Sequence, residues 1–252
     1  MWEALLLTEA SVISATDAGA LRMLNIQGLQ KTTLLDFPGY VAATVFLAGC
    51  NMRCPFCHNM NLVTSGESAA YTDDDIFAFL SGRTGLLDGV CVTGGEPTLY
   101  DDLPGFLGRI KELGFLTKLD TNGTNPQMIK LLTENGLVDY IAMDIKSSPQ
   151  KYGCSCGVKN IDLSPVRESI DLLINGNTQY EFRTTAVEEF LDEEAVRDIS
   201  QLLKGARRYF LQGYVESEFV PDKSLHAVTK EKLLRYKEEL SSSIECVELR
   251  GL

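Results

Sequence analysis

The stretch VAATVFLAGCNMRCPFCHN, residues 41–59, carries the strongest structural and chemical signal in this chain. Apart from Thr44, its first seven residues are apolar, and several are β-branched, a pattern that predicts a short buried strand. Directly after this strand, Cys50, Cys54 and Cys57 follow in the spacing Cys-x3-Cys-x2-Cys. An ordinary [4Fe–4S] cluster is held by four thiolates, so three thiolates leave one iron open. The stretch therefore predicts a strand whose carboxyl end carries a reactive metal site.

Three other kinds of site use similar cysteine patterns. A structural zinc site would add His58 to the three cysteines, although structural zinc sites usually combine two separated pairs of ligands. Residues 54–58 match the Cys-x-x-Cys-His pattern of covalent c-type haem, whose chemistry belongs to exported proteins. A thioredoxin-like dithiol would leave Cys50 without a role. On spacing alone, these alternatives stand beside the [4Fe–4S] cluster.

Outward from this stretch, short apolar runs alternate with longer segments of helical periodicity. We expect strands near residues 41–47, 89–93, 115–120, 139–145, 179–185 and 208–212. We expect helices over residues 72–81, 102–113, 126–135, 165–174, 192–203 and 225–239. Thr72 before three aspartates predicts a capped helix start, and Gly114 and Gly136 predict helix ends. Because alternating strands and helices form parallel sheets, we predict an α/β fold, a partial (β/α)6 barrel with helices outside a parallel sheet.

Polar residues recur where the predicted strands end. GGEP at residues 94–97 combines two glycines, which admit a close approach of backbone, with Glu96, which would accept a hydrogen bond from a ligand ammonium. The next four strands end in DTNG (120–123), DIK (144–146), EFRTT (181–185) and YFLQ (209–212). Alone, each motif also suits a turn or a local ion pair. Together they predict a ligand pocket on the same rim as the cysteines, because the carboxyl ends of parallel strands share one edge.

The composition limits the class of protein. The 252 residues are 44% hydrophobic and 23% charged with a net charge of −12, which suits one large α/β domain and disfavours nucleic acid as a partner. No segment approaches the roughly 20 apolar residues of a membrane span, so we expect no membrane partner. Seven cysteines without an export signal indicate reduced thiols and a cytoplasmic protein. We expect residues 1–22 to be a poorly ordered extension, or a misassigned translation start, before one domain at residues 23–252.

The cysteine spacing, with Phe56 just before the last cysteine, resembles the signature of the radical S-adenosylmethionine (radical SAM) superfamily. With the strand-end motifs, His58-Asn59 and the segment GLQKTTLLDFPG (residues 28–39), the chain from Ile26 onward resembles the activating enzymes of glycyl radical enzymes. It resembles in particular the longer form of the anaerobic ribonucleoside-triphosphate reductase activating protein. The resemblance implies a [4Fe–4S] cluster on Cys50, Cys54 and Cys57. It also implies S-adenosylmethionine (SAM) contacts by Phe56, Gly94, Gly95, Glu96, Asp120, Thr121, Asn122, Asp144, Lys146, Arg183 and Gln212.

The same resemblance implies a reaction and its partners. The enzyme would be an oxidoreductase that cleaves SAM reductively to a 5′-deoxyadenosyl radical, which takes a Cα hydrogen from a glycine of a partner glycyl radical enzyme. Flavodoxin or ferredoxin would supply the electron. A monovalent cation would be held by Asp120, Thr121 and Asp144, and Lys146 and Arg183 would face the cofactor or the target loop as the candidate catalytic side chains.

Two other functions remain at this point. A radical SAM enzyme can act on a small molecule, as 7-carboxy-7-deazaguanine synthase does, and a zinc-stabilised interaction module would be no enzyme at all. Cys91, inside an apolar strand, reads as a core residue. Cys154 and Cys156 follow in an expected loop and have no assigned role, while His226 is expected to be solvated on the last helix.

Overall fold

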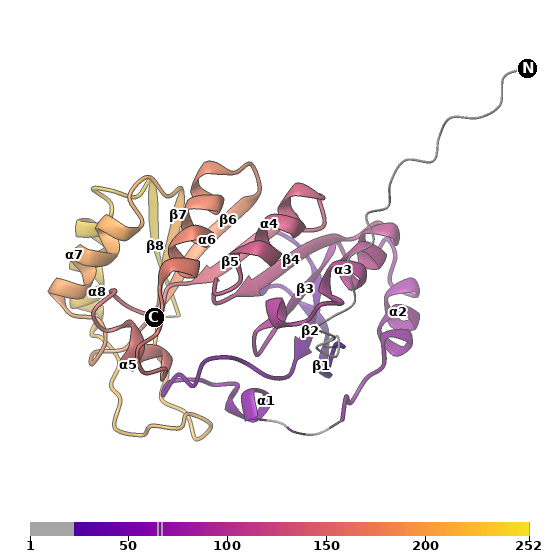
Figure 1. Cartoon of the computed structure of the whole chain (residues 1–252), viewed down its shortest axis with the longest axis horizontal. Coiled ribbons are helices and arrows are strands. Elements are labelled where there is room, and N and C mark those ends of the chain that lie inside the picture. Colours follow the sequence, from indigo (N-terminus) through magenta and orange to yellow (C-terminus); the bar gives the residue numbers. More distant parts are fainter. Residues whose placement is uncertain (1–22, 65, 67, 252) are drawn as a thin grey trace, which may run out of the picture.

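The computed structural model describes residues 23–64, 66 and 68–251, and within them eight strands form one sheet in the order β1 to β8 (Figure 1). The predicted extension at residues 1–22 lies outside the described residues. β1 pairs antiparallel to β2, and every later pair is parallel. The strands are β1 (Ile26–Thr33), β2 (Ala42–Leu47), β3 (Gly89–Gly94), β4 (Leu116–Thr121), β5 (Tyr140–Asp144), β6 (Gln179–Ala186), β7 (Arg208–Gly213) and β8 (Cys246–Arg250).

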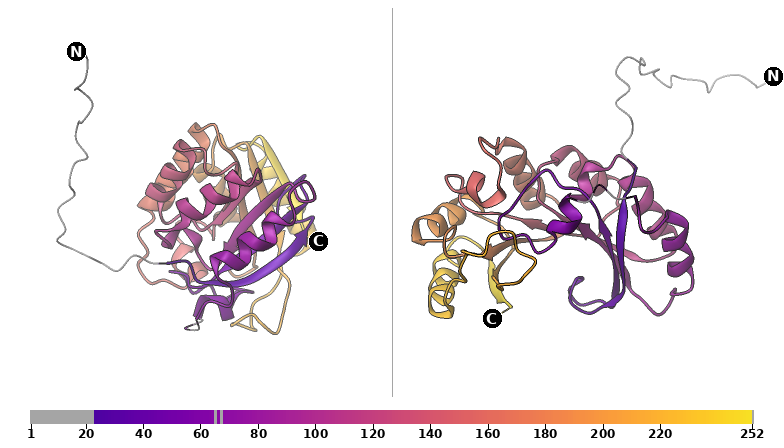
Figure 2. Two further views of the ribbon diagram at one scale, coloured as in Figure 1. Left: turned by 90° about the vertical axis from the view of Figure 1, so that its right-hand side faces the viewer. Right: turned by 90° about the horizontal axis from the view of Figure 1, so that it is seen from below.

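The six predicted strands are confirmed as β2 to β7, and the parallel α/β architecture is confirmed with them. β1 and β8 extend this (β/α) core by one strand at each edge. Figure 2 shows the sheet curved into an open arc with β1 and β8 at its two ends, so the barrel is partial, as the sequence predicts.

Nine helical segments accompany the strands within the described residues. They are α1 (Met60–Thr64), α2 (Asp73–Ser81), η1 (Pro97–Leu99), α3 (Leu103–Glu112), α4 (Pro126–Glu134), α5 (Tyr152–Cys156), α6 (Ser164–Asn175), α7 (Glu193–Leu202) and α8 (Lys230–Leu240). Thr72 caps α2 in a capping box with Asp75. Gly114 and Gly136 follow α3 and α4 with left-handed φ of 87° and 62°, which confirms both predicted helix ends.

Two local predictions are wrong. α8 begins at Lys230 and not near residue 225, because the Thr229 hydroxyl accepts a hydrogen bond from the Lys232 N–H and so caps the helix there. His226 therefore precedes the helix, exposed, with its Nδ1 2.8 Å from Glu189 Oε1. Cys154 and Cys156 lie in the short helix α5 and not in a loop.

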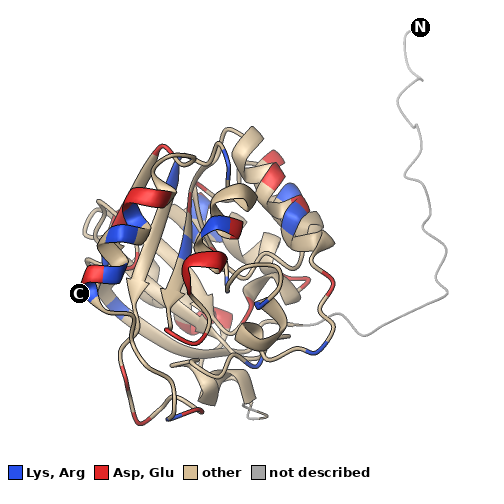
Figure 3. Cartoon of the chain, turned by 90° about the vertical axis from the view of Figure 1, so that its left-hand side faces the viewer, with Lys and Arg blue, Asp and Glu red and all other residues tan. Residues whose placement is uncertain are grey.

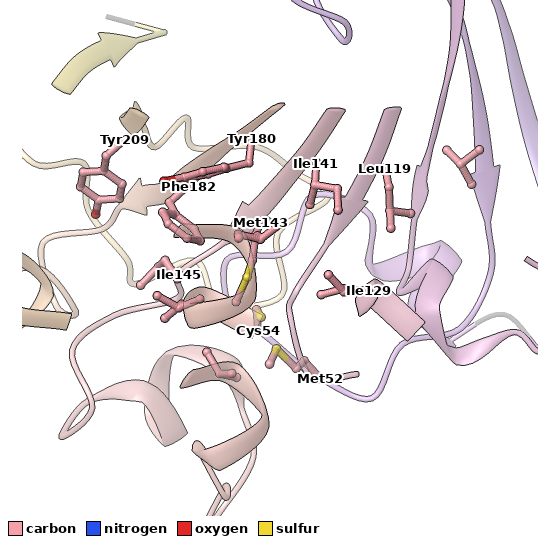
Figure 4. Close-up of a cluster of buried hydrophobic side chains, with 14 of the residues drawn as sticks. Met52, Cys54, Leu119, Ile129, Ile141, Met143, Ile145, Tyr180, Phe182 and Tyr209 are labelled. Atoms are coloured by element: carbon pink, nitrogen blue, oxygen red, sulfur yellow. The ribbon is translucent and has the colours of Figure 1, made fainter. Parts of the chain in front are cut away.

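The two faces of the sheet differ in character. Leu119, Ile141 and Tyr180 are register partners on β4, β5 and β6, and all three belong to the main apolar core with helix residues such as Ile129 of α4 (Figure 4). Because side chains alternate along a strand, the residues next to them point to the inner, concave face. That face carries a small separate apolar cluster of Phe37, Ala42, Leu116, Tyr140 and Ala142.

Charge on the outer surface is mixed in sign. On the face shown in Figure 3, Asp and Glu alternate with Lys and Arg along the helices. Among the described residues, no helix is long and apolar enough to cross a membrane.

Candidate active site

Every residue that the sequence analysis assigned to the cluster or to SAM lines one cavity of about 260 Å³ at the carboxyl ends of β3 to β7. The residues are Cys50, Cys54, Phe56, Cys57, Gly94, Gly95, Glu96, Asp120, Thr121, Asn122, Asp144, Lys146, Arg183 and Gln212. A larger hollow of about 860 Å³ lies between α4 and α6, and none of these residues lines it. The structure therefore brings the predicted residues together, while their roles stay predictions.

The three thiols of this cavity lie on the segment between β2 and α1. Burial raises the pKa of all three thiols, that of Cys54 to about 11. Without a metal, these groups are therefore neutral thiols at neutral pH. Metal binding would displace their protons, and the raised pKa values indicate that these thiols are not reactive as free nucleophiles.

Glycines hold the cysteine segment against β3. A Cβ added to Gly95 would lie 1.9 Å from the Gly49 carbonyl oxygen, closer than any side chain allows. The close approach lets the Gly95 N–H donate to the Leu47 oxygen at 2.7 Å and the Glu96 N–H donate to the Gly49 oxygen at 2.8 Å. The two glycines of GGEP therefore have a structural cause, which is close backbone contact of Gly95 with Gly49 of the cysteine segment and of Gly94 with Leu47 at the end of β2.

Two further segments hold the same loop from other sides. The Arg53 N–H donates to the Cys156 oxygen at 2.8 Å, and a Cβ at Gly157 would lie 2.0 Å from the Arg53 oxygen. The segment after β7 also reaches the loop, because the Asp222 N–H donates to the Pro55 oxygen at 3.0 Å. Backbone contacts from three directions thus fix the cysteine positions.

Glu96 is buried and serves mainly as an acceptor within the protein. Its Oε1 accepts from the Thr98 N–H and hydroxyl and from the Thr121 hydroxyl, and its Oε2 accepts from the Asn122 N–H at 2.6 Å. Burial raises the pKa of Glu96, and these hydrogen bonds oppose that rise. Each carboxylate oxygen has about two acceptor positions, and Oε2 uses one of them, so one position is left there; the ammonium partner stays a prediction.

A chain of alternating charges forms the floor of the cavity. Lys146 Nζ lies 2.9 Å from Asp144, and the Arg183 guanidinium bridges Asp144 at 2.9 Å and Asp120 at 3.3 Å. Asp120 also contacts the ammonium of Lys118. Burial raises the pKa of Asp144, but Arg183 and Lys146 outweigh it and hold that pKa at about 2.

The structure places the three predicted cation ligands in two groups. Asp120 and Asp144 meet at Arg183, whereas the Thr121 hydroxyl donates to Glu96 at 2.7 Å on another wall. The monovalent cation remains a prediction. Asn122 links the wall of Glu96 to the cysteine segment, because its N–H donates to Glu96 and its side-chain nitrogen lies 2.8 Å from Asn51 Oδ1 and 3.9 Å from Cys50 Sγ.

Several further residues line the cavity, although the sequence analysis assigned none of them to the cluster or to SAM. They are Met52, His58, Asn59, Val63, Thr93 and Thr185. Every second side chain of a strand lies on the same face, so the places of Thr93 and Thr185 in the cavity could have been predicted from the sequence. Lys118 lies one layer below the cavity. It could have been singled out from the sequence, because a lysine inside an apolar strand such as β4 is rare unless it is paired.

Within residues 23–64, 66 and 68–251, no three His, Cys, Asp or Glu side chains are grouped so that they could hold a single metal ion. A structural zinc ion needs four donors around one point, whereas in a [4Fe–4S] cluster each thiolate binds a separate iron.

Comparison with known proteins gives the family. Residues 44–202 match the family model of the radical SAM superfamily. A protein of Methanocaldococcus jannaschii named "putative glycyl-radical enzyme activating enzyme" is 35% identical over 193 residues, 75% of this chain and 79% of that protein. The 7-carboxy-7-deazaguanine synthase of Halobacterium salinarum is 38% identical over 86 residues, 34% of this chain and 33% of that protein.

A solved structure supports the fold. The crystal structure of a domain of pyruvate-formate lyase-activating enzyme from Bacteroides vulgatus superposes with a TM-score of 0.53 and 19% identity, over 65% of this chain and 99% of that one. Fold, cavity and matches together define an enzyme of the radical SAM superfamily, to which this chain belongs. Within the superfamily it groups with the glycyl-radical enzyme activating enzymes. A [4Fe–4S] cluster and SAM are the cofactors that this family uses.

Proposed function

We propose that this chain binds a [4Fe–4S] cluster through Cys50, Cys54 and Cys57 and generates a glycyl radical on a partner enzyme. The cavity of about 260 Å³ supports the proposal, because one buried and two partly buried thiols, held in place by backbone contacts, line it together with a polar floor. When bound, the cluster supplies the electron that cleaves SAM to methionine and a 5′-deoxyadenosyl radical. The partner glycine then loses its Cα hydrogen to that radical.

The chain's own residues bind and orient the cofactor. Glu96 keeps one acceptor position for the methionyl ammonium, and the floor of Lys146 and Arg183 offers cations to the methionyl carboxylate. Phe56 and Gln212 line the same cavity and would contact the remainder of SAM. The methionyl part of SAM carries both an ammonium and a carboxylate. The Glu96 carboxylate and the cations Lys146 and Arg183 lie on different walls, so each side can pair with one of these groups.

The electron donor is the less specific part of the proposal. Cys50 and Cys57 are only partly buried, so a cluster on these thiols would lie near the surface. A small one-electron carrier, flavodoxin or ferredoxin, would reach it there. Anaerobic ribonucleoside-triphosphate reductase is the partner we propose, on the resemblance of residues 28–39 and the strand-end motifs.

One experiment tests partner and reaction together. The anaerobically reconstituted and reduced protein is mixed with SAM and the candidate glycyl radical enzyme of the same organism, and electron paramagnetic resonance (EPR) is recorded. We expect a glycyl radical signal that disappears when the target glycine is replaced by alanine. SAM cleavage without a radical on any candidate partner would contradict the proposed protein substrate.

A small-molecule substrate is the second candidate function. The similarity of an 86-residue segment to a 7-carboxy-7-deazaguanine synthase favours it. The similarity to the synthase covers a third of the chain, whereas the similarity to the activating enzyme covers three quarters of it. SAM cleavage that rises on addition of a small heterocyclic substrate, with no partner protein present, would decide for this alternative.

A further inference from the structure

Lys118 is a buried cation for which the reaction described above has no role. It is 1% exposed and lies on the inner face of β4, two residues before Asp120. Its ammonium contacts the Asp120 carboxylate and lies 3.7 Å from Cys91 Sγ. Burying an ammonium is costly unless it is paired, so this lysine is retained against a considerable desolvation cost.

The contacts of the cavity floor leave one positive charge in excess. Lys118, Arg183 and Lys146 are the three cations, and the carboxylates of Asp120 and Asp144 are the two anions that they share. Without Lys118, the same network would be neutral. Lys118 thus decides whether the floor attracts an anion.

Other acids near the floor are engaged elsewhere. Glu181 forms a two-bond ion pair with Arg250, at 2.7 and 2.8 Å. Asp36 accepts from the Thr44 hydroxyl at 2.6 Å. Glu96 lies on the wall beneath η1 with four internal donors. Asp36 and Glu96 keep their own negative charge, but among the described residues neither forms an ion pair with the floor, whose direct ion pairs contain one more cation than carboxylates.

We propose that Lys118 is a positioning residue that holds Asp120 and supplies, as a fixed ammonium, the positive charge that a soluble monovalent cation would otherwise bring beside the SAM carboxylate. The inference rests on the proposed function, because it takes SAM as the occupant of the cavity. The position of the third predicted cation ligand agrees with it. The Thr121 hydroxyl donates to Glu96 and accepts from the Gly123 N–H at 3.1 Å, and neither bond points it to the two aspartates.

The test measures SAM affinity of the cluster-loaded protein by isothermal titration calorimetry. Wild type is compared in buffers whose monovalent cation is potassium, sodium or choline, which is too large for a side-chain site. We expect equal affinities. In choline, Lys118→Met should bind SAM more weakly by on the order of tenfold, the effect of one lost charge across a partly screened distance, and potassium or sodium should restore part of the loss.

Two further variants separate charge from structure. Lys118→Met combined with Asp120→Asn removes one charge of each sign and keeps the excess, so its affinity in choline should exceed that of Lys118→Met alone. Cys91→Ala removes a neutral neighbour of the ammonium and should bind SAM like wild type.

The outcomes are distinct. Wild-type binding that requires potassium or sodium overturns the inference, and so does a folded Lys118→Met protein with unchanged affinity. The wild-type comparison needs no variant, so it decides even if Lys118→Met does not fold. Failure of wild type to bind SAM in every buffer would instead contradict the proposed function.

Discussion

The contact between GGEP and the cysteine segment makes Gly95→Ala a sharp test of how the site is built. The new Cβ would meet the Gly49 carbonyl carbon at 2.6 Å and its oxygen at 1.9 Å. Both atoms belong to the backbone, so no side-chain rotation relieves the overlap. The two segments must separate by more than 1 Å to reach an ordinary contact, roughly the 3.4 Å at which van der Waals contact begins.

The cost has two parts. Overpacking in a tight interior costs about 1–3 kcal/mol. Separation also weakens the hydrogen bonds from Gly95 N–H to Leu47 and from Glu96 N–H to Gly49, each worth about 1 kcal/mol. We expect a total loss of about 3 kcal/mol in the free energy of unfolding, or a fall in Tm of roughly 6–12 °C for a domain of this size.

The assay compares thermal unfolding with iron and sulfide content after anaerobic reconstitution. The matched control is Gly105→Ala, because Gly105 lies inside α3 with nothing within 4 Å of an added Cβ. It should gain about 0.5–1 kcal/mol from helix propensity and load iron fully. A Gly95→Ala protein with wild-type Tm and full iron would refute the reasoning, because the cysteine positions would then not depend on this contact.

Three other changes test separate parts of the site. Cys54→Ala should lose most bound iron and abolish SAM cleavage by the purified protein; cleavage near wild type would show that the cluster assignment is wrong. Tyr140→Phe removes a 2.8 Å hydrogen bond to buried Glu181 and should cost about 1.5–2 kcal/mol in urea unfolding, whereas an unchanged midpoint would show that the bond contributes nothing. The pKa of Asp144 is lowered from 3.8 to about 2 by Arg183 and Lys146 against its burial, so its stabilisation is complete above pH about 4 and is lost as the pH falls towards about 2. Tm measured over that range should therefore fall less steeply for Asp144→Asn than for wild type, and parallel curves would argue against the shift.

Sequence periodicity predicted the six strands of the (β/α) core, because each is a short apolar run bounded by turn residues. It missed β1, whose sequence IQGLQKTT is only partly buried and contains a glycine, and β8, whose sequence CVELR has one buried residue. Both are edge strands, where a strand has one neighbour and needs less apolar sequence. The start of α8 was missed because its first turn is set by the Thr229 cap and not by periodicity.

The candidate site was predictable because the carboxyl ends of parallel strands share one edge. Which partner each polar group takes was not predictable, since that depends on distances across the sheet. Thr121 follows Asp120 in sequence but bonds Glu96, and Lys118 reaches Asp120 along the inner face. The number of buried charges on the floor therefore came only from the structure.

The central claim is that three cysteines hold a cluster with one open iron for SAM. EPR of the anaerobically reconstituted, dithionite-reduced protein, recorded before and after addition of SAM, tests it most directly. We predict the signal of a reduced [4Fe–4S] cluster with about four irons per chain, and a change in that signal when SAM binds the open iron. A protein that holds zinc and gives no signal, or a cluster signal that SAM leaves unchanged, would contradict the account.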